Sequence, residues 1–179
     1  EKPVTFDTIA PIGEKVDTPV VARYTEIVKT YPGFKLKVSP GFLRKGEVLG
    51  ILGANALGKT TFLKMVAGVE KTDIGEVQCY ATVAYKPQYL SSDYEGDVRS
   101  LLEGVSAGRL SEETFQTHIL GPLGLRRLYE KKMPELSGGE LQKVAIVACL
   151  MQDAEIYAFD EPSAFIDIED RIILAKAIQ

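Results

Sequence analysis

The first part of the chain carries the residue pattern of β structure. Residues 20–29 and 34–38 are β-branched or alternate between apolar and polar side chains, and Tyr31-Pro32-Gly33 lies between them. Such runs separated by a Pro-Gly turn are typical of a β-hairpin. Residues 1–19 contain three prolines and no sustained periodicity, so we expect an extended lead-in there.

The following residues alternate between strand and helix patterns. A short apolar run at 47–52 predicts a strand that enters a glycine-rich loop, and a helix is expected from Lys59 to Gly68. Residues 76–80 and 82–85 have the pattern of two further strands. The order of strand, loop, helix and strand indicates an α/β core.

The sequence changes character after Pro87-Gln88. Residues 97–105, 111–119 and 122–130 have helical spacing that is interrupted by glycines and a proline. A strand pattern returns at 155–159, and an amphipathic helix is predicted from about Asp167. We therefore expect the core to be interrupted by a helical subdomain at about residues 90–150.

Composition is that of an ordinary globular protein. The 179 residues are 45% hydrophobic and 26% charged, with a formal net charge of −4, so bulk charge does not indicate a nucleic-acid surface. Cys79 and Cys149 are far apart, and we expect buried free thiols in a reducing, cytoplasmic environment. The sequence contains no long apolar run and no signal-peptide pattern, so no membrane partner is expected.

Residues 53–60 match the pattern G-x4-G-K-[ST] of a phosphate-binding loop. Glycines at both ends let the backbone point successive N–H groups at phosphate oxygens, and the next helix presents its positive N-terminal end. Lys59 is expected to reach the β- and γ-phosphates of ATP, and the Thr60 hydroxyl is expected to bind Mg²⁺. The residues expected to contact nucleotide here are Gly53, Ala54, Asn55, Ala56, Leu57, Gly58, Lys59, Thr60 and Thr61.

An acidic pair, Asp160-Glu161, directly follows the apolar strand pattern at 156–159. A run this short predicts a buried parallel strand, and ligands bind at the carboxyl ends of such strands. We expect Asp160 to hold Mg²⁺, directly or through water. Glu161 is the expected catalytic base toward an attacking water.

Residues 137–140, Ser-Gly-Gly-Glu, form a capping box at the start of a predicted helix. Two glycines in a first turn are poor helix formers, which capping alone does not explain. They are expected if the bare helix N-terminus approaches a phosphate of another molecule. Ser137, Gly138, Gly139 and Glu140 are therefore candidate nucleotide contacts.

Three more residues are candidates because of their place in the sequence. Gln88 lies where the sheet pattern gives way to the helical insert, and its amide could sense Mg²⁺ or the attacking water. Tyr31 and Phe34 precede the core and could stack on adenine. Packing within the hairpin is an equally good account of both aromatic residues.

With these motifs together, the chain resembles the ATP-binding-cassette (ABC) superfamily from about Val20 onward. Residues 53–60 are similar to its Walker A loop, Gln88 to its Q-loop, and residues 136–142 to its signature. Residues 156–161 resemble Walker B, and 163–167 the D-loop. The resemblance implies an α/β, P-loop NTPase (ABC ATPase) core with an antiparallel β lead-in. It also implies a second cassette, placed head-to-tail in the same chain or in a homodimer.

Several segments are more similar still to the ribosome-recycling ATPases of archaea and eukaryotes, subfamily E, also called RNase L inhibitors. They include residues 33–36, 84–89 and 160–167, and the Ser163-Ala164 pair resembles the second cassette of that family. The resemblance implies hydrolysis of Mg–ATP, with a second cassette, to drive a conformational change in ribosome recycling. The small ribosomal subunit and a release-factor-like protein are the implied partners.

The chain departs from the family pattern at several positions. Ala56 and Ala54 stand where glycine and proline are usual, and alanine adds strain at position 56 if φ is positive there. The sequence stops at Gln179, before the expected histidine switch, and the only histidine, His118, lies in the helical insert. We expect a truncated cassette that alone hydrolyses ATP weakly or not at all. The alternatives are a nucleotide-binding subunit of an ABC transporter and a non-catalytic ATP-binding module.

Overall fold

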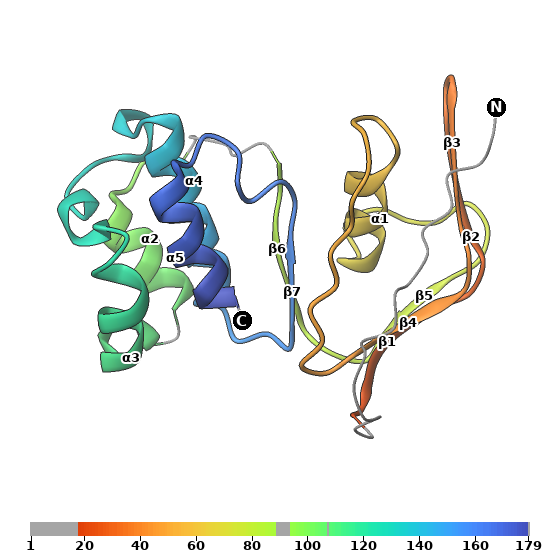
Figure 1. The fold of residues 1–179 in the computed structure, drawn as a ribbon, viewed down its shortest axis with the longest axis horizontal. Coiled ribbons are helices and arrows are strands. Elements are labelled where there is room, and N and C mark those ends of the chain that lie inside the picture. Colours follow the sequence, from red (N-terminus) through yellow and green to blue (C-terminus); the bar gives the residue numbers. More distant parts are fainter. Residues whose placement is uncertain (1–17, 89–93, 107, 179) are drawn as a thin grey trace. The chain divides into compact units, whose positions relative to one another are not determined.

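The computed structural model describes residues 18–88, 94–106 and 108–178, so most of the predicted lead-in lies outside it. Contacts divide the chain into two compact units, Glu1–Val83 and Ala84–Gln179 (Figure 1). The first unit contains β1 (Val20–Tyr24), β2 (Ile27–Tyr31), β3 (Phe34–Val38), β4 (Gly41–Arg44), α1 (Lys59–Val66) and β5 (Val77–Cys79). Strand β6 (Val83–Lys86) begins at the last residue of this unit and continues into the second.

The second unit is mostly helical. Its longer helices are α2 (Val98–Val105), α4 (Gly138–Leu150) and α5 (Ile168–Ile178), and strand β7 (Ile156–Phe159) lies between the last two. The short helices are η1 (Arg109–Ser111), α3 (Glu113–Phe115), η2 (Gln116–Leu120), η3 (Leu125–Leu128) and η4 (Met133–Glu135).

The predicted hairpin is confirmed as the antiparallel pair β2–β3. Its register pairs Ile27 with Val38 and Tyr31 with Phe34, so the chain turns at Pro32-Gly33. Gly33 has a φ of 78°, a left-handed conformation that glycine adopts without strain. The predicted strand at 20–29 is two strands, because β1 joins a different sheet, of order β4-β1-β5.

Helix α1 packs on the hairpin to form the core of the first unit (Figure 1). The helix starts at Lys59, as predicted, and its C-cap Ala67 is followed by Gly68 at a φ of 71°. The buried side chains of this core are Ile27, Leu36, Val38, Phe62, Met65 and Val66. Apolar side chains of the hairpin and of α1 therefore pack together. This packing fixes the start of α1, where the 53–60 loop ends.

The strand predicted at 47–52 is wrong. The ladders assigned within the described part of the first unit join β1 to β4 and β5, and β2 to β3. The apolar run has no such partner there, and Val48, Leu49 and Leu52 are exposed. Apolar side chains alone do not make a strand, because each strand needs a ladder to satisfy its backbone groups.

In the second unit β6 and β7 pair, and helices pack into one apolar core. The predicted strands at 82–85 and 155–159 are confirmed within one residue of their ends. Helix α4 supplies Val144, Ile146 and Val147 to the core, and α5 supplies Leu174. Both helices start close to their predicted positions, and Asp167 caps α5 by accepting a hydrogen bond of 2.9 Å from the Asp170 N–H.

The middle of the helical subdomain is more irregular than predicted. Residues 97–105 form α2 as expected, but 111–119 and 122–130 break into the short helices α3, η2 and η3. Gly124 has a φ of 64° directly before η3, which a continuous right-handed helix cannot contain. Leu120, Leu123, Leu125 and Leu128 are nevertheless buried, so packing rather than helical length orders this stretch.

The cysteine prediction is half right. Cys149 is buried on α4, where burial raises the pKa of its thiol to about 12. Cys79, at the end of β5, is exposed. Among the described residues, no helix has both the length and the apolarity that crossing a bilayer requires.

Candidate nucleotide-binding site

The loop at residues 53–60 has the backbone of a phosphate cradle. Gly58, the N-cap of α1, has a φ of 93°. A Cβ atom there would lie 2.9 Å from Leu36 Cδ1 and 3.0 Å from Phe34 Cζ, so any other residue would be strained by the positive φ and would also displace two hairpin side chains. The loop therefore ends at a bare helix N-terminus, with Lys59, Thr60 and Thr61 in its first turn.

Ala56 adopts a φ of 64° within the same loop. The positive φ that would strain an alanine is therefore present at position 56. A Cβ atom makes this left-handed region unfavourable by about 1–2 kcal/mol. Loop residues 53–56 are exposed, so no close packing accounts for the conformation.

The Lys59 ammonium lies over its own loop. Its Nζ donates hydrogen bonds of 2.8 Å to the carbonyl oxygens of Gly53 and Ala54. These contacts hold the cation at the loop mouth, where it can exchange carbonyl oxygens for phosphate oxygens. A phosphate oxygen carries a negative charge that a carbonyl oxygen lacks, so Coulomb attraction to the ammonium favours this exchange when a phosphate is present.

The two hairpin aromatics are stacked on one another. Tyr31 and Phe34 have ring centroids 6.4 Å apart and an interplanar angle of 21°, and the Lys29 ammonium lies 5.6 Å from the Tyr31 centroid. Phe34 also faces Gly58. Packing within the hairpin therefore describes both residues, and adenine stacking stays a prediction.

Asp160 follows β7 and is buried, with 2% of its surface exposed. Among the described residues its Oδ2 atom has no hydrogen-bond partner. The Asp160 N–H donates to the Lys86 carbonyl at 3.0 Å, and Lys86 Nζ donates to the Asp160 carbonyl at 2.9 Å. A buried, unpaired carboxylate oxygen fits a hard cation such as Mg²⁺, which takes oxygen ligands.

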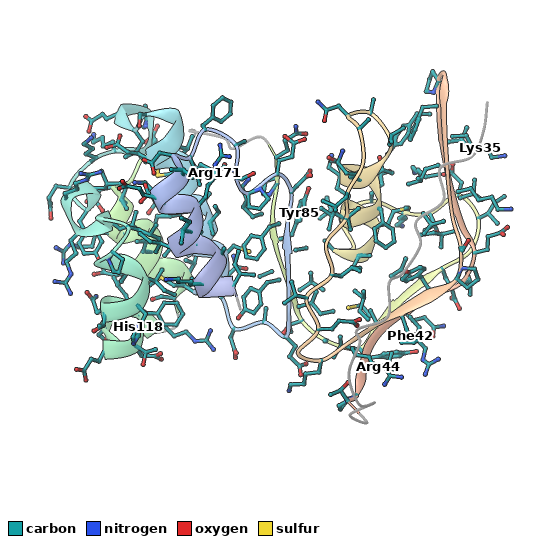
Figure 2. All side chains as sticks on the ribbon, viewed as in Figure 1. Lys35, Phe42, Arg44, Tyr85, His118 and Arg171 are labelled. Atoms are coloured by element: carbon teal, nitrogen blue, oxygen red, sulfur yellow. The ribbon has the colours of Figure 1, made fainter. Side chains whose placement is uncertain are left out.

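Two side chains of β6, those of Tyr85 and Lys86, interact electrostatically with this carboxylate (Figure 2 labels Tyr85). Burial lowers the pKa of the Lys86 ammonium, and the charge of Asp160 opposes that effect. Burial also raises the pKa of the Tyr85 hydroxyl, with the charge of Asp160 acting in the same direction. The sequence analysis missed Lys86, although a lysine in an otherwise apolar strand pattern is a visible signal.

Glu161 has a φ of 47°, a conformation that is rare for a residue with a side chain. Gln142 Nε2, on α4, donates a 2.9 Å hydrogen bond to the Glu161 carbonyl. The Ala164 N–H donates to the same oxygen at 3.2 Å. The candidate base thus has a strained backbone that two donors hold in place.

The capping box at the start of α4 is confirmed. The Glu140 N–H donates to Ser137 Oγ at 3.3 Å, and the Ser137 N–H donates to Glu140 Oε2 at 2.9 Å. Lys131 Nζ pairs with Glu140 Oε1 at 3.0 Å. The Ser137 N–H bond and then Lys131 lower the pKa of the Glu140 carboxyl to about 2.

The second glycine of this turn has a role inside the chain. A Cβ atom on Gly139 would lie 2.7 Å from the carbonyl oxygen of Phe165, whereas one on Gly138 would make an ordinary contact of 3.8 Å. Phe165 has a φ of 60° and 82% of its surface is exposed. Close approach by the chain's own D-loop segment therefore explains Gly139, and it leaves Gly138 open to another molecule.

Comparisons with known proteins decide the family. The model of the ABC transporter family matches residues 41–164, more than half of the chain. ABC transporter E family member 3 of Arabidopsis thaliana is 40% identical over 82% of this chain and 84% of its own length. The chain belongs to the ABC family, and within it to the E family.

Other relatives are much longer than this chain. An uncharacterized ABC transporter ATP-binding protein of Methanocaldococcus jannaschii is 46% identical over 100% of this chain and 30% of its own length. Translation initiation factor RLI1 of Saccharomyces cerevisiae is 40% identical over 87% of this chain and 26% of its own length. The chain thus spans less than a third of either protein.

Solved structures confirm the predicted fold, that of an ABC cassette with a P-loop NTPase core. An RNase-L Inhibitor matches with a TM-score of 0.88 and 49% identity over 92% of this chain and 32% of its own. An archaeal ribosome recycling factor, in a complex with the ribosomal stalk protein aP1, matches with a TM-score of 0.87 and 48% identity over 94% of this chain and 33% of its own. This chain is therefore an ATP-binding-cassette domain.

The predicted site residues of this E-family domain fall into two groups. The phosphate loop and the hairpin aromatics belong to the first unit, and Gln88, the acidic pair and the signature belong to the second. Gln88 is half-buried and precedes residues 89–93, which lie outside the described residues. Within the second unit the structure joins the acidic pair to the signature helix through Gln142, a contact that sequence reasoning missed.

Proposed function

We propose that residues 20–179 form one ABC nucleotide-binding domain that binds Mg²⁺–ATP. Paired with a second cassette, the domain hydrolyses ATP to drive a conformational change in ribosome recycling. The observation that carries the ATP part is the buried carboxylate of Asp160, whose Oδ2 has no partner among the described residues. Such a group is unfavourable by itself and is satisfied by a metal ion.

The residue roles in this proposal follow from chemistry. Lys59 binds the β- and γ-phosphates, and the backbone of residues 53–61 cradles them. Thr60, Gln88 and Asp160 would hold Mg²⁺, which would supply charge neutralisation at the phosphates. Glu161 accepts a proton from, or orients, the attacking water, and the Gln88 amide senses that water or Mg²⁺. Tyr31 and Phe34 would flank the adenine at the hairpin end of the loop.

The signature residues serve a second cassette. Helix α4 runs for 13 residues, and its first-turn residues Gly138 and Gly139 carry no side chains of their own beside their N–H groups. Such an end attracts phosphate. The second cassette would lie head-to-tail, in the same polypeptide or as a second copy.

The ribosomal part of the proposal is supported by the relatives. One is named a translation initiation factor, and one matched structure is a ribosome recycling factor with a stalk protein. A further match is titled a model of ribosome-bound archaeal Pelota and ABCE1, at a TM-score of 0.85 and 50% identity. We infer the small ribosomal subunit and a release-factor-like protein as partners, in the cytoplasm.

Sedimentation of the natural full-length protein with small ribosomal subunits tests this function. Replacing Glu161 with Gln removes the base and leaves Mg²⁺–ATP binding largely intact, so the variant should stay in an ATP-bound, closed form. We expect Glu161→Gln to co-sediment with small subunits in ATP and not in ADP. Glu169→Gln, a matched change at an exposed glutamate of α5, should behave as wild type.

Two results that contradict this expectation would each indicate a different function. A Glu161→Gln variant that never co-sediments, yet associates with membranes, identifies a transporter subunit. A full-length protein that binds ATP without turnover, with or without ribosomes, identifies a non-catalytic module.

A further inference from the structure

Two buried side chains hold the main chain of the acidic pair. Lys86 Nζ donates to the carbonyl oxygen of Asp160, and Gln142 Nε2 donates to that of Glu161, both at 2.9 Å. Each donor residue has only 2% of its surface exposed. The main-chain carbonyl groups of Asp160, the candidate metal ligand, and Glu161, the candidate base, are thus held by side chains of two different elements, β6 and α4.

Lys86 is an unfavourable choice for this place if it serves stability alone. It lies at the end of a strand whose other buried position is Ala84, and burial of an ammonium group is strongly disfavoured. Its own backbone already joins the two strands, because its carbonyl accepts from the Asp160 N–H at 3.0 Å. The side chain adds a second, charged tie to the same residue.

Gln142 holds the more strained of the two positions. Glu161 has a φ of 47°, and such a conformation persists only where its surroundings fix it. The Glu161 carbonyl accepts from Gln142 Nε2 and from the Ala164 N–H. Removing the amide would leave one weaker donor at 3.2 Å to hold the backbone.

We propose that Lys86 and Gln142 are positioning residues that fix the orientation of the Asp160 and Glu161 carboxyl groups. Lys86 aims the Asp160 carboxylate at Mg²⁺, and Gln142 aims Glu161 at the attacking water. The metal part of this inference rests on the proposed function. The other part, that the two side chains hold the main chain of residues 160–164, does not rest on the proposed function.

The charge of Lys86 and its positioning role predict opposite effects of its removal on Mg²⁺ binding. A cation beside a metal site weakens Mg²⁺ binding by repulsion, so its removal should tighten binding if charge dominates. If positioning dominates, removal should weaken binding, because the Asp160 carboxylate loses its orientation. The sign of the effect therefore separates the two roles.

Hydrogen exchange tests the backbone part without nucleotide. In Lys86→Met and Gln142→Met, the amides of Asp160 and Ala164 should exchange about tenfold faster than in wild type, as expected for loss of one neighbouring hydrogen bond. Two matched controls should leave this segment unchanged. Lys143→Met removes a different buried lysine, which lies on α4, and Gln152→Met removes an amide that donates to the Ala148 carbonyl. Unchanged exchange in both test variants would overturn the proposal.

Calorimetric titration with ATP tests the metal part. The readout is the factor by which Mg²⁺ tightens ATP binding over binding in EDTA. We expect Lys86→Met to reduce this factor about tenfold and to leave the affinity in EDTA within about twofold of wild type. If Mg²⁺ tightens ATP binding to Lys86→Met as much as to wild type, or more, Lys86 does not position Asp160. This conclusion holds even if the variant unfolds at the wild-type temperature.

The two experiments separate this inference from the proposed function. If wild type binds no ATP, the proposed function fails, and exchange at residues 160–164 still decides whether Lys86 and Gln142 hold the acidic pair. If ATP binds as proposed and exchange is unaffected, only the positioning inference fails.

Discussion

A Cβ atom on Gly139 would lie 2.7 Å from the carbonyl oxygen of Phe165. This contact sets the first turn of α4 against the segment that follows the acidic pair. Real Cβ atoms do not come so close to backbone oxygens, so the position requires glycine. Gly138, one residue earlier, would meet only the Phe165 side chain at 3.8 Å, an ordinary contact.

Alanine substitution at these two glycines should have opposite effects. Gly139→Ala must displace the Phe165 backbone, and we expect a loss of about 1–3 kcal/mol in the free energy of unfolding. Gly138→Ala should be neutral or stabilising by up to about 1 kcal/mol, because alanine favours the helix. Denaturant unfolding of both variants measures the difference, and equal stabilities would show that Phe165 does not press on Gly139.

Glycine at position 56 should stabilise the protein. Ala56 has a φ of 64°, so Ala56→Gly relieves strain of about 1–2 kcal/mol, which outweighs the loss of up to about 1 kcal/mol through the entropy of the unfolded chain. Ala54→Gly is the matched control, because Ala54 has no positive φ in the same loop. That change should lower stability by up to about 1 kcal/mol through the entropy of the unfolded chain. A loss of stability in Ala56→Gly would mean that the loop does not hold position 56 in a left-handed conformation.

Stability should depend on pH through Glu140. The folded-state pKa of its carboxyl is lowered from 4.5 to about 2, chiefly by the Ser137 N–H. A depressed pKa contributes stability that is present above pH 4.5 and is lost as the pH falls toward 2. We expect wild type to exceed Glu140→Gln by on the order of 1 kcal/mol at pH 7, and by progressively less below pH 4.5. Exposed Glu103→Gln is the control, and a gap as wide at pH 2.5 as at pH 7 would contradict the assignment.

Local patterns in the sequence predicted the hairpin, the phosphate loop, α1 and the capping box. Each depends on residues close together in the chain, such as Pro32-Gly33 in a turn or Ser137 with Glu140 in a cap. The family resemblance marked Ala56 as strained if φ were positive there, and the structure confirms the positive φ.

Features that depend on distant partners were not predictable in this way. The apolar run at 47–52 looked like a strand, yet strand formation depends on a ladder partner that the pattern does not specify. Lys86 bonds to Asp160, and Gln142 to Glu161, across long stretches of sequence. A helical period or a motif gives residue types, but not which carbonyl a buried donor reaches.

Calorimetric titration with Mg²⁺–ATP of wild type, Lys59→Ala and Lys64→Ala tests the central claim most directly. Lys59 Nζ lies at the mouth of the 53–60 loop, whereas Lys64 is on the last turn of the same helix. Loss of one charge-assisted phosphate contact, about 1.5–3 kcal/mol, predicts binding weaker by about ten- to a hundredfold in Lys59→Ala. Lys64→Ala should bind as wild type. Equal dissociation constants for wild type and Lys59→Ala would contradict the claim that this loop binds ATP.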